Sequence, residues 1–226
     1  MARMARAVFP GIPHHVTQRG NGRAQTFFCD DDYSLYRDLL STQAKVHGVE
    51  VWSWVLMPNH VHLILVPPAV EALSRVMSSV HRRYAGHIHA RLKRTGHFWQ
   101  GRFGCVAMDE HHLGAALRYV ALNPVRAGLV ERVSDWAWSS AHVHLGRVAD
   151  DGLTLKATVA DRYPQFAELL ASAEDEIATK RLRQAESVGR PLGAADFLAR
   201  LEAKSGRVLA AGTEGGGSGE LSGVSP

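Results

Sequence analysis

Cysteine is nearly absent from this sequence. The 226 residues include only Cys29 and Cys105, which lie far apart and belong to no CxxC pair. Neither a disulfide framework nor a zinc ribbon is therefore available, and we expect a reducing, cytoplasmic environment. Long apolar runs are absent too, because no stretch approaches the roughly 18 residues that a membrane helix needs. No apolar segment precedes Pro10, so we expect neither an export signal nor a membrane span.

Acidic residues are scarce in the first two thirds of the chain. Residues 1–148 hold 17 lysines and arginines against 10 aspartates and glutamates, a net charge of +7, whereas the remainder holds 9 against 12, a net charge of −3. This asymmetry predicts that the N-terminal part contacts a polyanion. All 13 histidines also lie at or before His144, so we expect any chemistry in the same part.

The hydrophobic pattern predicts a β-α-β-β-α-β-α order of elements. Aspartates at 30–32 supply an N-cap and negative charge for the first helix, and Trp52 and Trp54 are expected on one face of a strand. Proline should end the last helix at Asn123-Pro124. This order favours an α+β class, with a ferredoxin-like antiparallel sheet and one extra helix. The expected ranges are strands over 14–18, 49–57, 60–66 and 102–108, and helices over 30–47, 71–93 and 109–124.

The pattern loosens after the seventh element. We expect one domain over 1–148 and a linker near 146–152. A helical appendage over 149–209 then contains helices at about 163–185 and 194–205. Residues 210–226 are rich in glycine and serine and have no apolar period, which predicts disorder.

Two histidines stand in the middle of an apolar strand. His60 and His62 are two positions apart, so their side chains point to the same face and can converge on one divalent metal. Two histidines on a solvated face would give the same pattern. The triplet also recurs as His142-Val143-His144, but only the first copy is continued by a buried strand.

The last helix of the domain carries a candidate nucleophile. Tyr119 and Asn123 lie four residues apart, away from the apolar stripe of that helix, and so share one edge. A half-exposed tyrosine followed by an asparagine cap is the alternative interpretation. Tyr84 competes as a nucleophile, but its helical spacing from apolar neighbours favours packing.

A basic segment without any acidic residue separates Glu71 from Asp109. It contains seven lysines and arginines, and toward its end these are interleaved with an aromatic loop that includes Phe98 and Trp99. Positive charge beside aromatic rings is typical of sites that hold single-stranded nucleic acid. A solvated basic helix would explain the first half of this segment but not the loop. The basic residues are Arg75, Arg82, Arg83, Arg91, Lys93, Arg94 and Arg102.

Three separated motifs resemble those of the REP-associated tyrosine transposases, a branch of the single-tyrosine HUH transposases of the IS200-like family. They are MPNHVHL at 57–63, GHFWQGRF at 96–103 and RYVALNPVRAG at 118–128. The opening HVTQRGN at 15–21 and WAWSS at 136–140 also fit. The resemblance covers about residues 8–145.

The resemblance implies a transposase that nicks and rejoins hairpin-bearing single-stranded DNA. It implies His60, His62 and Asn123 as metal ligands, Mg²⁺ or Mn²⁺ as cofactor, and Tyr119 as the nucleophile of a 5′-phosphotyrosine intermediate. We expect a nucleoid-associated monomer or homodimer. The residues expected to contact DNA are Arg19, Arg75, Arg82, Arg83, Arg94, His97, Trp99 and Arg102.

Two other functions remain open from the sequence. A metal-dependent phosphohydrolase would use the histidine pair without Tyr119. A non-catalytic DNA-binding regulator derived from a transposase would need the basic segment but neither His60 nor Tyr119.

Overall fold

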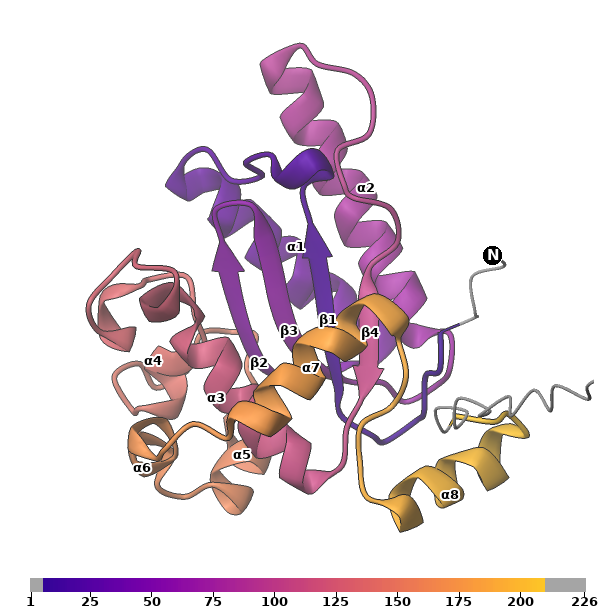
Figure 1. Cartoon of the computed structure of the whole chain (residues 1–226). Helices are drawn as coiled ribbons and strands as arrows, with labels where there is room; N and C mark the ends of the chain where they lie inside the picture. Colours follow the sequence, from indigo (N-terminus) through magenta and orange to yellow (C-terminus); the bar gives the residue numbers. More distant parts are fainter. Residues whose placement is uncertain (1–5, 210–226) are drawn as a thin grey trace, which may run out of the picture.

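The computed structural model describes residues 6–209, and an antiparallel sheet forms its centre (Figure 1). Its four strands are ordered β2-β3-β1-β4, which confirms the predicted α+β class and the order of the first seven elements. The strands are β1 (His14–Arg19), β2 (Glu50–Met57), β3 (His60–Val66) and β4 (Gly104–Ala107). The helices are α1 (Asp30–His47), α2 (Ala72–Leu92), α3 (Glu110–Arg126), α4 (Ala141–His144), α5 (Lys156–Arg162), α6 (Phe166–Ala171), α7 (Glu176–Val188) and α8 (Ala195–Ser205), with 3-10 turns at Asn21–Arg23 and Val133–Asp135.

The sheet separates two apolar layers. Successive residues of a strand face opposite sides, so Leu63 and Leu65 of β3 pack toward α1 and α2, while Ile64 packs toward α3. Figure 1 shows α1 and α2 behind the sheet and α7 crossing in front of it. Among the described helices, none is long and apolar enough to cross a membrane.

A β-bulge in β2 corrects the prediction that Trp52 and Trp54 share a face. The pairing with β3 shifts between Val51 and Ser53, so one extra residue is inserted at Trp52. Trp54 consequently packs in the layer of α1 and α2, and Trp52 packs in the layer of α3.

The start of α1 differs in detail from the prediction. Cys29 is the N-cap and makes no side-chain capping hydrogen bond, while Asp30, Asp31 and Asp32 form the first turn. Asp32 accepts a hydrogen bond from the Phe28 amide at 2.8 Å instead of capping the helix. The predicted first-turn negative charge is therefore present.

Helix α3 continues past the proline that was expected to end it. Pro124 lies inside α3, which ends at Arg126. Gly128 then adopts a left-handed φ of 66° and closes the last turn. Pro124 lacks the N–H that would donate to the Val120 carbonyl, but α3 ends two residues later, so the helix loses only one hydrogen bond near its C-terminus.

The chain after residue 148 packs onto the sheet and α3. The helix expected over 163–185 is divided into α6 and α7, which are separated by 172–175. Helix α8 confirms the helix expected over 194–205. Helix α7 contacts β4 and α3, so it covers the sheet face opposite α1 and α2. The tail expected to be disordered, 210–226, lies outside the described residues.

Candidate active site

His60 and His62 lie side by side near the start of β3. Their ring centroids are 4.9 Å apart with planes at 84°. Burial lowers the pKa of His60 to about 4; the Arg19 charge adds to this effect, and a hydrogen bond with the Asn123 side chain opposes it. Burial and then the neighbouring His15 and His60 hold the pKa of His62 well below its usual range. Both rings are therefore neutral near pH 7, the form that binds metals.

Helix α3 brings Tyr119 and Asn123 to these histidines. The Tyr119 ring stands edge-on to His62, with centroids 5.3 Å apart at 87°. Asn123 hydrogen-bonds His60. Tyr119 and Asn123 are each only 8% exposed, which corrects the alternative of a half-exposed tyrosine. The structure thus assembles all four residues that the family resemblance assigned to the site.

Two arginines surround the Tyr119 ring. The guanidinium carbons of Arg126 and Arg183 lie 5.2 Å and 5.4 Å from its centroid. Burial raises the pKa of Tyr119 and the Glu186 charge adds to the rise, while an Arg183 hydrogen bond to the side chain and the Arg126 charge oppose it. The arginines therefore favour a phenolate that burial alone would disfavour.

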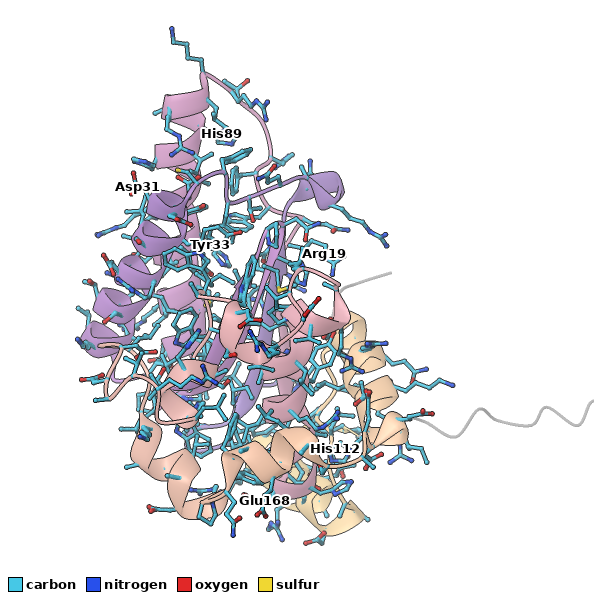
Figure 2. All side chains as sticks on the ribbon, turned by 90° about the vertical axis from the view of Figure 1, so that its left-hand side faces the viewer. Arg19, Asp31, Tyr33, His89, His112 and Glu168 are labelled. Carbon is cyan, nitrogen blue, oxygen red and sulfur yellow. The ribbon has the colours of Figure 1, made fainter. Side chains whose placement is uncertain are left out.

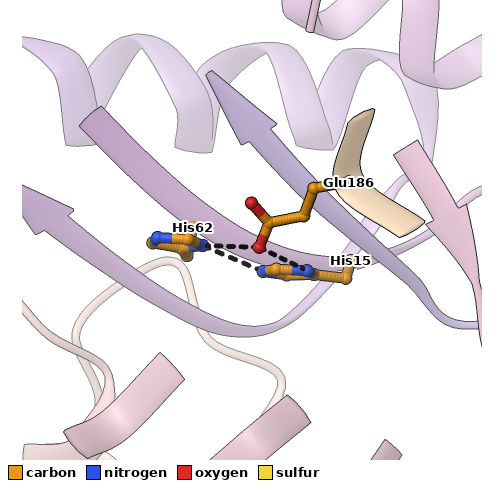
Figure 3. A group of neighbouring side chains, drawn as sticks. All are labelled: His15, His62 and Glu186. Carbon is orange, nitrogen blue, oxygen red and sulfur yellow. Dashed lines mark hydrogen bonds and ion pairs between the residues drawn. The ribbon is translucent and has the colours of Figure 1, made fainter. Parts of the chain in front are cut away.

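His15 and Glu186 also belong to this site, and the sequence analysis did not assign them. His15 Nε2 lies 3.0 Å from His62 Nδ1, and a carboxylate oxygen of Glu186 lies 3.7 Å from His15 Nδ1 (Figure 3). Burial raises the pKa of Glu186 to about 7, against the charges of Arg19 and Arg183. His15 belonged to the matching opening motif, but no sequence signal places α7, and hence Glu186, over the sheet.

The residues present fit a divalent metal. His62 Nε2 is buried and has no hydrogen-bond partner in the described structure, so in the tautomer with the proton on Nδ1 its lone pair is available to a metal beside His60 and Asn123. His15, His62 and Glu186 additionally offer ligand atoms that lie within 4.8 Å of one another. Imidazole and oxygen ligands of this kind suit Mn²⁺ and Mg²⁺.

An open cleft leads to the histidine pair. It has a volume of about 400 Å³, and its walls include His60, His62, Arg19, Arg102 and Arg183. Arg19, labelled in Figure 2, is the last residue of β1. It pairs with His60 in the antiparallel register of β1 and β3. Of the residues predicted to contact DNA, Arg19 and Arg102 thus lie at the candidate active site.

The other predicted DNA contacts lie farther along α2 and the loop after it. Arg75, Arg82 and Arg83 are exposed on α2, and Arg94 and His97 are exposed in the loop.

Trp99, also predicted to contact DNA, is directed inward. Its indole nitrogen donates to the His81 carbonyl at 3.1 Å, and its ring packs against Tyr36 and Tyr84. Arg91 of the basic segment is likewise engaged, because it pairs with the buried Asp32.

The competing motifs have structural roles. His142 and His144 lie in the short helix α4, and each has a ring nitrogen 2.9 Å from a backbone carbonyl, of Trp136 and Trp52 respectively. Tyr84 is fully buried and donates its hydroxyl to the Thr26 carbonyl at 2.8 Å. The preference for the first histidine triplet and for Tyr84 as a packing residue is therefore consistent with the structure.

The family model and the similar proteins found by comparison all describe transposases. Residues 10–123 match the family model described as "Transposase IS200 like". The chain is 24% identical over 116 residues to the REP-associated tyrosine transposase of Escherichia coli (strain K12), which covers 51% of this chain and 68% of that protein. A putative REP-associated tyrosine transposase of Haemophilus influenzae is 24% identical over 128 residues, covering 51% of this chain and 72% of that protein.

A solved structure has the same fold. It is described as a REP-associated tyrosine transposase bound to a REP hairpin, and it matches with a TM-score of 0.56 and 24% identity over 65% of this chain and 87% of that one. The family match ends at residue 123, so Arg183 and Glu186 lie outside it.

Proposed function

Since the chain belongs to the IS200-like family of transposases, we propose that it cleaves and rejoins hairpin-bearing single-stranded DNA through a covalent link to Tyr119. The observation that carries this proposal is the burial of Tyr119 against His62, in a site that also contains His60 and Asn123. A tyrosine with a merely structural role would not need a neutral histidine pair and two arginines around its ring.

The chain's own groups account for the nucleophilic step. The Tyr119 oxygen attacks a DNA phosphorus, the bond from phosphorus to the 3′ oxygen breaks, and the proton lost by tyrosine ends on the released 3′ hydroxyl. Arg183 and Arg126 stabilise the negative charge on the phenolic oxygen before attack. The phosphotyrosine link conserves the phosphodiester, so a second 3′ hydroxyl can reverse the step and complete strand transfer.

We propose that His60, His62 and Asn123 hold a Mg²⁺ or Mn²⁺ ion. Such an ion supplies charge neutralisation and orientation of the scissile phosphate. The free Nε2 of His62 and the neutral state of both histidines support this assignment.

The cleft and the basic helix supply the groups that would hold DNA. Arg19 and Arg102 line the cleft beside the histidines and would bind phosphates next to the reacting bond. The exposed arginines of α2 and the loop would hold the hairpin farther away. The similar solved protein is described as bound to a REP hairpin, which supports DNA of this class as the partner. One copy of the chain supplies both the histidines and Tyr119, so we propose that a monomer suffices.

A cleavage assay tests this function. Purified protein is incubated with single-stranded hairpin DNA from the flanks of its own gene, with Mn²⁺ or Mg²⁺ or with EDTA, and resolved on a denaturing gel. We expect a covalent protein–DNA band that requires metal and is absent from Tyr119→Phe and His60→Ala. Tyr163→Phe serves as the matched control, because that hydroxyl donates to the Glu110 carbonyl and is not part of the site.

The other outcomes separate the rival functions. Metal-dependent cleavage that survives Tyr119→Phe without any adduct would indicate a phosphohydrolase. Tight DNA binding with no cleavage under any metal condition would indicate a DNA-binding regulator. Either result would overturn the proposed transposase chemistry.

A further inference from the structure

Three unpaired polar atoms lie together on the sheet face that α7 covers. They are His15 Nδ1, His62 Nε2 and a carboxylate oxygen of Glu186, each buried without a hydrogen-bond partner in the described structure. His15 is fully buried and His62 is 2% exposed. Unsatisfied buried polar atoms are costly, so a cluster of three indicates a function.

These three residues form a triangle of contacts, in which the same Glu186 oxygen lies 3.7 Å from His15 Nδ1 and 4.0 Å from His62 Nδ1. His15 Nε2 lies 3.0 Å from His62 Nδ1, and the two ring planes differ by only 5° with centroids 5.1 Å apart. Figure 3 shows the two rings edge-on and end to end, with one oxygen of the Glu186 carboxylate joined by dashed lines to both rings. The facing unpaired atoms of Glu186 and His15 are 3.7 Å apart. Only the Nε2 end of His62 remains open.

We propose that Glu186 and His15 are positioning residues that fix the tautomer of His62, so that its Nε2 carries the lone pair that binds the metal. This inference rests on the proposed function for the identity of the ligand. It adds to that function two residues, one of them from α7, outside the matched family region.

The proton positions follow from donor and acceptor capacity. An ionised carboxylate attracts N–H groups, and the Glu186 oxygen lies nearer to His15 Nδ1, at 3.7 Å, than to His62 Nδ1, at 4.0 Å, so it favours the His15 tautomer with the proton on Nδ1. His15 Nε2 is then unprotonated and accepts a hydrogen bond from the Nδ1–H of His62. His62 Nε2 is left unprotonated. Carboxylates that act in this way on metal-binding histidines orient the ring and raise its basicity as a ligand.

Direct coordination by His15 fits the geometry less well. The lone-pair positions of His15 Nε2 and His62 Nδ1 point at each other in nearly coplanar rings, whereas an ion bound to both nitrogens at about 2.0–2.1 Å would have to lie to one side of the line that joins them. His62 Nδ1 has one lone pair or one proton, and the contact with His15 already uses it. An ion held by His15 would therefore require that contact to break.

Two variants at His15 and two readouts test the proposal. His15→Phe keeps a ring but removes the hydrogen bond, whereas the side-chain carbonyl of His15→Gln can still accept the proton of His62 Nδ1. The readouts are the His62 tautomer, from nitrogen–proton correlations of isotope-labelled histidine without metal, and the affinity for Mn²⁺ by calorimetry. Glu176→Gln, an exposed change in the first turn of the same α7, is the matched control.

We expect the wild-type and Glu176→Gln proteins to hold His62 with its proton on Nδ1. His15→Phe should give mixed tautomers and bind Mn²⁺ about 10- to 100-fold more weakly, the usual loss when an outer-shell partner is removed. His15→Gln should stay within a few-fold of wild type, and Glu186→Ala should lie between the two.

Three results would overturn the proposal. A wild-type His62 with its proton on Nε2 contradicts it without any variant, so the test stands even if His15→Phe does not fold. An unchanged affinity of His15→Phe for Mn²⁺ would show that the contact between His15 and His62 does not affect metal binding. A His15→Gln protein as weak as His15→Phe shows that His15 itself binds the ion. If the wild-type protein has the expected His62 tautomer but forms no DNA adduct, the roles proposed for His15 and Glu186 stand and the proposed function is wrong.

Discussion

Asp32 connects the first two helices through a buried charge. It is 1% exposed and accepts two hydrogen bonds, one from the Phe28 amide at 2.8 Å and one from Arg91 Nη2 at 2.7 Å. Burial tends to raise its pKa, but the hydrogen bonds from Arg91 and Phe28 outweigh burial and lower the pKa. From the sequence, Arg91 belongs to the basic segment expected to bind nucleic acid, but in the structure its side chain pairs with the buried Asp32.

Replacing Asp32 should destabilise the protein. Asp32→Asn removes the buried charge to which the Arg91 side chain and the Phe28 amide donate, and weakening hydrogen bonds to a charged group costs roughly 1.5–3 kcal/mol. Urea unfolding at pH 7 followed by circular dichroism measures the change in free energy of unfolding. Because the folded pKa of Asp32 is lowered, the difference between variant and wild type should shrink as the pH falls through that pKa.

Asp31 provides the comparison for this prediction. It is exposed in the same helical turn, so Asp31→Asn loses only a favourable charge near the helix N-terminus, worth about 0.3–1 kcal/mol. Equal losses in the two variants would show that the charge of the first turn matters and the buried pair does not.

His81 makes the folded state sensitive to acid. It is 8% exposed, its Nε2 lies 3.1 Å from the Tyr36 hydroxyl, and its ring packs against Trp99. Burial, with the charge of Arg6 as a smaller cause, lowers its pKa to about 3. An unfolded histidine has a pKa near 6.5, so the stability that neutral His81 provides is complete above that pH and is lost as the pH falls toward 3.

The size of this effect can be measured. At pH 5 one such group reduces the free energy of unfolding by about 2 kcal/mol relative to pH 7.5. His81→Gln should therefore reduce the loss between these two pH values by about that amount, although it lowers stability at pH 7.5. The exposed His97→Gln serves as control. An unchanged pH dependence in His81→Gln would show that the pKa of His81 is the same in the folded and unfolded states.

At the scale of elements, the contact of α7 with the sheet depends on Gly104. A Cβ placed at this position would lie 2.6 Å from Thr17 Oγ1 and 3.0 Å from the Glu186 carbonyl oxygen. The first atom belongs to β1 and the second to the backbone of α7, so β4 can approach both only without a side chain.

Gly104→Ala should loosen α7 locally. Overpacking of this kind costs about 1–3 kcal/mol, and α7 is the element that can move away. Hydrogen exchange should therefore become faster in α7 and remain unchanged in α1. Gly86→Ala on α2, where a Cβ meets nothing within 4 Å, should instead stabilise the helix by roughly 0.5–1 kcal/mol. Uniformly faster exchange in Gly104→Ala would mean that α7 does not open separately.

The elements themselves were largely predictable because their signals are local. Helix α1 has the predicted bounds, and the bounds of β2 and β3 lie within one residue of the predicted ones. Two incorrect predictions each concern a short segment. The bulge at Trp52 depends on the packing of both faces of the sheet, and α3 includes Pro124 because the helix ends two residues later, where proline removes only one hydrogen bond.

The site was predictable only in part, since its residues come from distant segments. Strand periodicity placed His60 and His62 on one face, and the helical wheel placed Tyr119 and Asn123 on one edge. Their convergence depended on the family resemblance. Glu186 and Arg183 have no local signature, because their role comes from α7 crossing the sheet. Tyr119 is buried for the same reason.

At the scale of the whole molecule, positive charge is distributed in two zones. Arg19 and Arg102 lie in the cleft at the candidate site, and the exposed arginines of α2 and the following loop lie beyond it. Contacts to phosphates release counterions, so the two zones together should make DNA binding strongly dependent on salt.

Arg94 allows this arrangement to be tested without affecting the chemistry. It is exposed in the loop after α2, and Arg94→Ala should weaken binding of hairpin DNA and reduce the slope of log affinity against log salt by about 0.7–0.9, the contribution of one phosphate contact. Fluorescence anisotropy in EDTA measures binding without cleavage. Arg200→Ala on α8, where the arginine pairs with Asp196 at 2.8 Å, removes the same charge elsewhere and should leave the slope unchanged. Identical slopes for all three proteins would place the hairpin away from this loop, and equal reductions in both variants would show that net charge, rather than a defined contact, holds the DNA.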